Sequence, residues 1–270
     1  EYNGSSWSEV NDLNSGRGNF QGTGTSEAGV VFGGSSNNTY TEEWNGSNWS
    51  EVNDMIMGRH NHMKLGITSE AALAVGGNTT ESGYTDNDVE DWNGTNWSAG
   101  TALLSNAAYG SSAGTYDSGL IFKWSGSETF CWNGSNWSEA HDRVIPRHCT
   151  AGAGSSNDAL ITGGNSPTVG NNTVCTELYN GTSWSTGPNL ATGRGQLSSA
   201  DGGNTGTGTT MVFGGAGTST EHYNLNVSSA SFHNLEITNL TGDGTPFSAS
   251  LQSQLLTSVT QISNSISGSF

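Results

Sequence analysis

The sequence predicts an all-β protein built from repeated units of four short strands, and three observations predict this fold class. A hexapeptide made of an aromatic residue, Asn-Gly, two small polar residues and Trp occurs five times between residues 2 and 184. Apolar runs that end in Gly-Gly lie between these hexapeptides, and an Arg follows the first aromatic by 15 residues in four of the five units. Self-similarity at a fixed period is the mark of a repeat architecture.

The period of the repeat points to a β-propeller. The first aromatics are separated by 42, 48, 40 and 47 residues, and a degenerate sixth copy follows after 44 more. A period of about 40–50 residues suits a propeller blade of four strands. We therefore expect about five four-stranded blades within residues 1–224, or six if sequence upstream of residue 1 contributes. The anchors are Tyr2, Trp44, Trp92, Trp132, Tyr179 and the degenerate Tyr223.

Each unit divides into four predicted strands. The first is rich in Gly, Ala and Ser, as an innermost strand near a crowded axis would be. The second is a continuous apolar run, which indicates burial on both faces. Asn-Gly is expected to join the third and fourth strands in a tight hairpin, because both residues tolerate positive φ. The second aromatic of each hexapeptide is expected to pack between blades; these residues are Trp7, Trp49, Trp97, Trp137 and Trp184. The strand that contains Trp7 is expected to complete the last blade.

Four of the seven cationic residues occupy one repeat position: Arg17, Arg59, Arg147 and Arg194. A functional basic patch would cluster differently, so each Arg is expected to fix its blade by bonding nearby carbonyl or carboxylate oxygens. The third unit departs from the pattern, with Ala107 at the Arg position and Lys123-Trp124 in place of Gly-Gly.

The combination of a Gly-Gly doublet after an apolar strand, an aromatic, a nearby Trp and a following Arg resembles the kelch-type β-propeller repeat over residues 1–224. More weakly, the NGSNW repeats and the NLEITNL and ISGSF segments resemble tail-fibre and other virion proteins of marine bacteriophages. The first resemblance implies a propeller, and the second implies a virion appendage.

Loop lengths vary on one face of the predicted propeller. From the doublet position to the next anchor the distances are 11, 16, 9, 16 and 9 residues. Insertions gathered on one face often mark a binding face, although surface loops also tolerate insertions without any function. The candidate binding residues are Tyr84, Asp86, Asn87 and Asp88 in the second unit, and Thr168, Asn171 and Asn172 in the fourth.

Charge and chemistry exclude several classes. The net charge of −17 argues against nucleic acid and membrane partners. Three cysteines, Cys131, Cys149 and Cys175, are expected to pack as small apolar residues, or one pair to be bridged. His60 and His62 form an H-x-H pair that would point to one side of a strand, but no third ligand accompanies it. The carboxylates of EVND at 9–12 and 51–54 and of TDND at 85–88 are candidate Ca²⁺ ligands, although the full loop pattern with its fixed Gly and Glu is absent. We expect no catalytic residues, no cofactor, no metal and no enzymatic activity.

Residues 225–270 are predicted to form a connector. One or two strands precede an apolar helical stripe, Leu251, Leu255, Val259, Ile262 and Ile266. The stripe would pack on the rest of the chain or on another copy or subunit.

The sequence therefore favours a non-enzymatic structural or binding module at a virion or extracellular surface, most plausibly a tail fibre, another appendage or an adhesion propeller. Its partners would be other virion or surface proteins, itself through the tail, or a cell-surface glycan or protein receptor. The alternative is a secreted, lectin-like carbohydrate-binding propeller, and a kelch-like oxidase is less favoured.

Overall fold

The computed structural model describes residues 1–3, 5–36, 38–79, 85–124, 126–201, 209–215 and 220–224. The regular elements of this part are all strands, and within it no helix is long and apolar enough to cross a membrane. Chain contacts separate Glu1–Val227 from Ser228–Phe270. The predicted connector, 225–270, lies outside the described residues.

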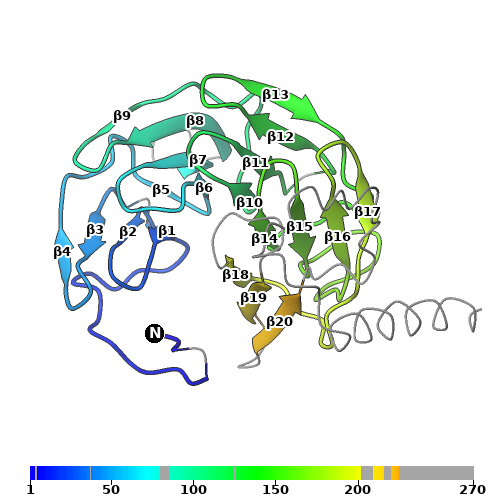
Figure 1. Ribbon diagram of the computed structural model, residues 1–270. Helices are drawn as coiled ribbons and strands as arrows, with labels where there is room; N and C mark the ends of the chain where they lie inside the picture. The colour runs from blue at the N-terminus through cyan, green and yellow to red at the C-terminus, as the bar shows by residue number, and fades with distance from the viewer. Residues whose placement is uncertain are drawn as a thin grey trace, which may run out of the picture. The chain divides into compact units, whose positions relative to one another are not determined.

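The strands form five antiparallel sheets that follow one another along the chain (Figure 1). The first blade contains β1 (Gln21–Gly24), β2 (Gly29–Phe32), β3 (Thr41–Trp44) and β4 (Trp49–Glu51). The second contains β5 (Arg59–His60) and β6 (Met63–Leu65), which both pair with β7 (Ala72–Thr79), then β8 (Thr85–Trp92) and β9 (Trp97–Ala99).

The third blade contains β10 (Ser111–Gly114), β11 (Gly119–Phe122), β12 (Thr129–Trp132) and β13 (Trp137–Ala140). The fourth contains β14 (Ala151–Gly154), β15 (Ala159–Thr162), β16 (Thr176–Tyr179) and β17 (Trp184–Thr186). The fifth sheet has three described strands, β18 (Leu197–Asp201), β19 (Thr209–Gly214) and β20 (Thr220–Asn224).

The sheets are arranged as propeller blades. Their innermost strands β1, β6, β10, β14 and β18 contact one another in turn around a common centre. The predicted all-β propeller is therefore confirmed, with four complete blades. The fifth unit differs from the expected four strands, because β20 is the last described strand of its sheet.

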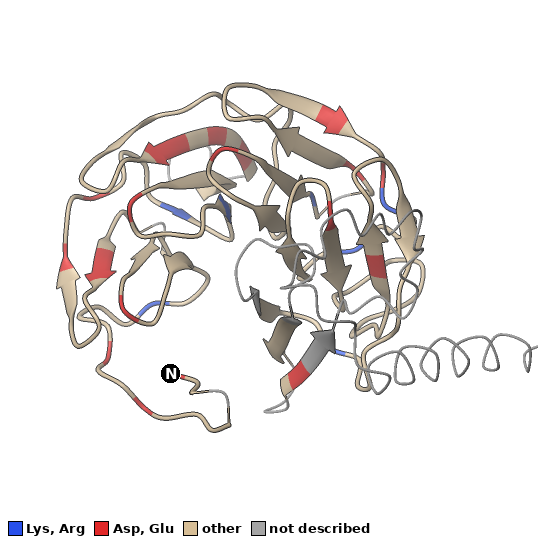
Figure 2. Cartoon of the chain, in the orientation of Figure 1, with Lys and Arg blue, Asp and Glu red and all other residues tan. Residues whose placement is uncertain are grey.

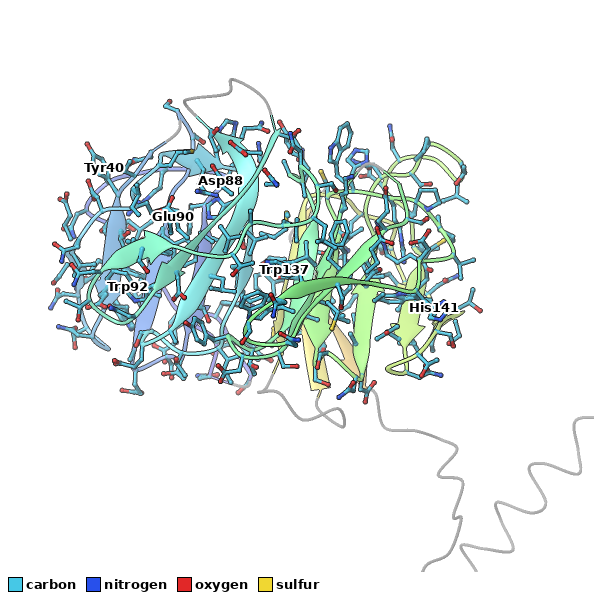
Figure 3. The ribbon with its side chains drawn as sticks, turned by 90° about the horizontal axis from the view of Figure 1, so that it is seen from above. Tyr40, Asp88, Glu90, Trp92, Trp137 and His141 are labelled. Atoms are coloured by element: carbon cyan, nitrogen blue, oxygen red, sulfur yellow. The ribbon has the colours of Figure 1, made fainter. Side chains whose placement is uncertain are left out.

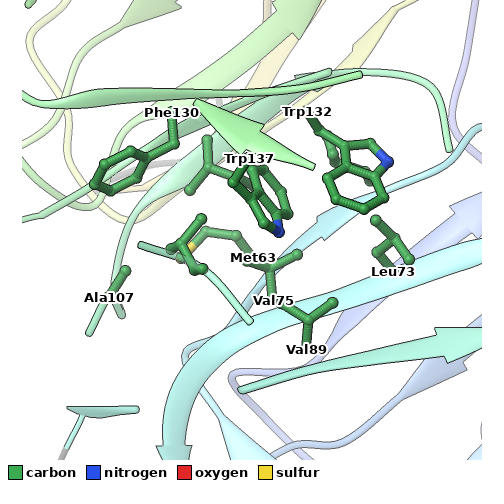
Figure 4. Packing of buried hydrophobic residues seen from close by; sticks show 11 residues of the cluster. Met63, Leu73, Val75, Val89, Ala107, Phe130, Trp132 and Trp137 are labelled. Carbon is green, nitrogen blue, oxygen red and sulfur yellow. The ribbon is translucent and has the colours of Figure 1, made fainter. Parts of the chain in front are cut away.

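The core lies between blades rather than within them. Second strands such as β2, β11 and β15 are buried along their whole length, as their continuous apolar runs predict. The fourth-strand Trp of one blade packs on the second strand of the preceding blade. Trp97 stacks edge-on against Phe32 with ring centroids 4.9 Å apart, and Trp184 lies 5.3 Å from Phe122. Figure 4 shows the cluster between the second and third blades, where Trp137 lies among Met63 and Val75.

Trp7 occupies a different place from the one expected. Its ring centroid lies 5.7 Å from Phe213 of β19, which repeats the Trp97–Phe32 contact across a blade boundary. Trp7 bridges to Tyr2 and is not part of the β18–β19–β20 sheet. The hairpin of residues 2–7 therefore corresponds to the outer strands of the next ring position rather than to the fourth strand of the fifth sheet.

The Asn-Gly hairpins also differ in detail from the prediction. Gly46 has positive φ, but Asn45 does not. Instead, the Asn45 side-chain Oδ1 accepts hydrogen bonds from the backbone N–H groups of Ser47 and Asn48, at 3.0 and 2.9 Å. Asn is thus used for its side-chain acceptor, in an Asx turn, rather than for tolerance of a left-handed backbone. The same pair of bonds recurs at Asn3, Asn93, Asn133 and Asn180.

A chain of backbone hydrogen bonds links all five sheets at the mouth of the central channel. Each link begins two residues after the repeat Arg position, at a non-Gly residue with φ of 53–57°. Four bonds connect these residues in series: the N–H groups of Asn61, Tyr109, Cys149 and Gln196 each donate to the C=O of the equivalent residue in the preceding blade, at 2.8–3.0 Å. The members are Asn19, Asn61, Tyr109, Cys149 and Gln196, and they line a channel cavity of about 900 Å³.

Candidate functional site

The repeat Arg residues build one buried constellation in four of the units. Arg59 Nη2 pairs with Glu90 at 2.7 Å, and Arg59 Nη1 donates to the carbonyls of Gly76 and Asp88, both at 2.8 Å. Equivalent ion pairs join Arg17 to Glu42, Arg147 to Glu177 and Arg194 to Glu221. The side chains of Arg147 and Glu177 are fully buried. These contacts fasten the entry of each blade to its own third strand.

In the first, second and fourth blades, the Gly-Gly doublet joins the blade to the next one. Both glycines have positive φ, and the second donates its N–H to the carbonyl at the Arg position of the following blade. These bonds run from Gly34 to Arg59 at 2.9 Å and from Gly164 to Arg194 at 2.7 Å. A Cβ at Gly33 would lie 2.6 Å from His62 Cε1, so this crowded junction requires glycine.

The third blade replaces both halves of this constellation. Ala107 stands at the Arg position and Phe130 at the Glu position, and both are buried in the apolar cluster between the second and third blades (Figure 4). Lys123-Trp124 stands in place of the doublet. The ion pair of the other blades is thus exchanged for an apolar pair at the same two positions.

Arg143 supplies the contact that the missing doublet would make. It lies in the link between the third and fourth blades, is 3% exposed, and donates from Nη1 to the Arg147 carbonyl at 3.1 Å. Its Nη2 donates to the carbonyls of Lys123 and Gly126, at 2.6 and 3.0 Å. Burial and the adjacent Arg147 lower the pKa of Arg143 to about 10, so it stays charged at neutral pH. Arg143 was not among the sequence candidates, although the sequence shows that it lies outside the position shared by the four repeat Arg residues.

With Arg143 holding the junction, the third blade exposes a group of aromatic rings on the loop face. Trp124 is 39% exposed and lies at 5.8 Å from Tyr109 and 5.3 Å from His148, edge-on to both. Tyr109 Oη accepts a hydrogen bond from Asn78 of the second blade at 2.9 Å. We call Tyr109, Trp124 and His148 the aromatic cluster.

A cavity of about 250 Å³ opens beside Trp124. It is lined by residues of the third-blade loop, of the following link and of the fourth-blade insertion: Trp124, Gly126, Pro146, His148, Ser166, Pro167 and Asn171. The cavity therefore lies between the short loop of the third blade and the longer insertion of the fourth blade.

The candidate residues of the second unit lie mostly in a strand rather than in a loop. β7 and β8 extend beyond the doublet as a longer hairpin, so Asp86, Asn87 and Asp88 belong to β8. Asp86 accepts from Thr79 Oγ1 at 3.2 Å, and Asn87 Nδ2 donates to the Leu103 carbonyl at 2.8 Å. Asp88 is exposed, toward the same edge as Tyr40 in Figure 3. Tyr84 lies outside the described residues.

The candidates of the fourth unit lie in its insertion. Thr168, Asn171 and Asn172 are all exposed. Thr168 hydrogen-bonds Ser166, and Asn172 has φ of 53° and donates its N–H to Asn165 Oδ1 at 2.9 Å. Asn171 lines the cavity beside Trp124, whereas no Asp or Asn of β8 does. The two sets of candidates are therefore not joined in one pocket.

The histidines and cysteines do not form the arrangements that their spacing suggested. Asn61, left-handed, separates β5 from β6, so the alternation assumed for His60 and His62 is broken. His62 is 1% exposed, and burial first, then Arg59, lowers its pKa well below the ordinary value. The three cysteines are free and partly buried, so no pair is bridged. No three His, Cys, Asp or Glu side chains gather as a metal site within the described ranges.

The acidic charge is spread over the outer strands. Figure 2 shows acidic residues on β3, β4, β8 and β13. In the third-blade loop, Lys123 Nζ lies 3.7 Å from Glu128 Oε1, so these two opposite charges are paired. The cavity itself is lined by no Lys, Arg, Asp or Glu among the described residues.

Blades that repeat one buried constellation around a channel define the class of this protein as a β-propeller. No protein-family model and no curated protein matches the sequence. Among solved structures, the chain is similar to one described as "Structure of YjhT", with a TM-score of 0.64 and 13% sequence identity. That likeness covers 81% of this chain and 83% of the other, and at this identity it speaks for the fold alone.

Proposed function

We propose that this chain is a non-enzymatic recognition module that binds its target with the loop face of the propeller, around the aromatic cluster of the third blade. The observation that carries the proposal is the exposure of Trp124 and Tyr109 in the one complete blade that abandons the repeat's ion pair and glycine doublet. Exposed aromatics next to a cavity, with long loops on either side, are typical of binding surfaces.

The setting that fits this module best is a virion appendage or a surface adhesin. The repeat motif resembles the kelch type, and the lysine-poor, acidic surface disfavours non-specific association. A lectin-like propeller is the second candidate, and it is favoured by the same exposed Trp beside polar side chains.

Binding of the labelled full chain to whole bacterial cells, measured by flow cytometry, tests the proposal. Trp124→Ala is expected to reduce the bound fraction at least about tenfold, as for a central aromatic contact. Thr95→Arg, on an exposed hairpin of the opposite face, is the matched control and should leave binding unchanged. Equal losses in both variants would contradict the assignment of the face, and mass spectrometry of purified phage particles tests the virion setting.

A further inference from the structure

We propose that the cavity beside Trp124 binds a single ring of a neutral sugar. This inference rests on the proposed function, because it names the ligand class of the same face. It is argued from the size of the cavity, from the chemistry of its lining and from its charge.

The size fits one small ring. The cavity volume of about 250 Å³ lies just below the roughly 300–1,000 Å³ typical of pockets for drug-sized ligands. Pro146 and Pro167 form part of the wall, and proline rings fix the backbone φ on which they sit. These two fixed φ angles restrict the backbone of the wall, which lowers the ordering cost of binding.

The lining offers one apolar platform and several hydroxyl partners. The π face of Trp124 carries negative charge density, which attracts the polarised C–H groups on one face of a sugar ring. The His148 ring nitrogens and the Asn171 carboxamide make no hydrogen bond within the described part of the chain. A neutral imidazole and a carboxamide each offer both a donor and an acceptor, which is what a sugar hydroxyl needs.

The charge favours a neutral sugar over an anionic one. Burial lowers the pKa of His148, so the ring is neutral at pH 7. Two cations next to lining residues are already engaged: Lys123, which precedes Trp124, faces Glu128, and Arg143 is bonded to three backbone carbonyls, that of Gly126 among them. A carboxylate in the cavity would therefore meet no free cation among the lining residues.

Saturation-transfer NMR on the full chain tests this assignment, with glucose, galactose and N-acetylglucosamine as neutral probes and glucuronate and N-acetylneuraminate as anionic ones. At least one neutral probe is expected to bind with Kd on the order of 1 mM, more tightly than either anion. Trp124→Ala should weaken this binding at least about tenfold. Trp124→Phe, which keeps a ring, should weaken it less and guards against loss of folding in the Ala variant. Tyr40→Ala, an exposed aromatic on the first blade, is the control and should bind as the wild type does.

Saturation transfer from no neutral probe, tighter binding of an anion, or equal losses in Trp124→Ala and Tyr40→Ala would each overturn the sugar assignment. Trp124-dependent cell binding without sugar binding would overturn only this inference and leave the proposed function intact. If Trp124→Ala keeps both cell binding and sugar binding, the sugar assignment and the proposed function are both overturned.

Discussion

The third and fourth blades solve the same packing problem in two ways. The fourth blade buries Arg147 and Glu177 as an ion pair, whereas the third places Ala107 and Phe130 at the same positions, at 0% and 2% exposure. Exchange of a buried ion pair for a well-packed apolar pair is often neutral, but removal of one partner alone is costly. The comparison teaches that the position demands a matched pair rather than a charge.

The blade junctions make the same point. The fourth blade uses the left-handed glycines Gly163 and Gly164, and the third uses Lys123, Trp124 and a guanidinium from the next link. Because Arg143 supplies the donor to the Arg147 carbonyl and also holds the carbonyls of Lys123 and Gly126, the third-blade loop needs no glycine at the junction and can carry an exposed Trp. The departure from the repeat thus exposes Trp124 while the Arg147 carbonyl keeps a hydrogen-bond donor.

The largest effect is expected where a matched pair is broken. Arg147→Met would leave Glu177 buried without its cation and should lower the free energy of unfolding by about 3–5 kcal/mol. Arg147→Ala with Glu177→Phe copies the third blade and should recover most of this loss, but not all, since Glu177 also accepts from the N–H of Val144 at 2.6 Å. Urea unfolding measures both, and a double variant as unstable as the single one would refute the matched-pair idea.

A similar loss is expected at the outer Trp of the third blade. Trp137 is 7% exposed and its Nε1 donates to the Thr101 carbonyl at 2.9 Å, so Trp137→Ala should cost about 3–5 kcal/mol. Trp49 of the first blade is only partly buried, so Trp49→Ala should cost less while leaving target binding intact. Trp7, 54% exposed, should cost least. Thermal unfolding of the three variants checks this order, and equal shifts would contradict it.

Arg143 should stabilise the junction after the third blade, as the Gly-Gly doublet does in the first, second and fourth blades. Arg143→Ala removes the donor to three carbonyls, and we expect a loss of about 2–3 kcal/mol in urea unfolding. The fluorescence of Trp124 should also change. Its contribution is obtained, for the wild type and for Arg143→Ala, by subtracting the spectrum of the same protein that also carries Trp124→Phe. Arg194→Lys, which alters a cation outside the third blade, should leave that difference spectrum unchanged.

The smallest effect on stability is expected from the protonation of His62. His62 stands three residues after the repeat Arg position of the second blade, where the third blade has Gly110. The folded chain holds His62 neutral, whereas the unfolded chain protonates it below about pH 6.5. Its contribution to stability is therefore complete above that pH and is lost as the pH falls, with a slope of at most about 1.4 kcal/mol per pH unit. His62→Leu should flatten the stability profile below pH 6.5, and an unchanged slope would show that another group titrates.

The repeat positions were predictable because period and spacing translate directly into geometry. The strand order, the inter-blade Trp residues and the carbonyl and carboxylate contacts at the Arg positions follow from a pattern visible in the letters. The aromatic cluster was not predictable in this way, because Trp124, Tyr109 and His148 are brought together from separate loops. The departure of the third unit from the repeat was a signal for Trp124 and Tyr109, whereas His148 follows the repeat Arg of the fourth unit and carried none.

Two errors of detail have physical causes. Positive φ was expected at Asn45, but its φ is not positive, and its side-chain Oδ1 instead accepts hydrogen bonds from two backbone N–H groups. Trp7 was expected to complete the last blade, but a fourth-strand Trp packs across a blade boundary, so its contact with Phe213 belongs to the next ring position. Neither packing direction nor side-chain capping can be read from residue propensity alone.

The backbone links at the channel mouth have a consequence for protein engineering. Neighbouring blades join there through main-chain N–H and C=O groups, so these four links do not depend on which side chains the five positions carry. The positions already hold Asn, Asn, Tyr, Cys and Gln, and a further residue in the left-handed region costs only about 1–2 kcal/mol. The side chains at Asn19, Asn61, Tyr109, Cys149 and Gln196 can therefore be exchanged to change the lining of the channel cavity while the backbone links between the blades are kept.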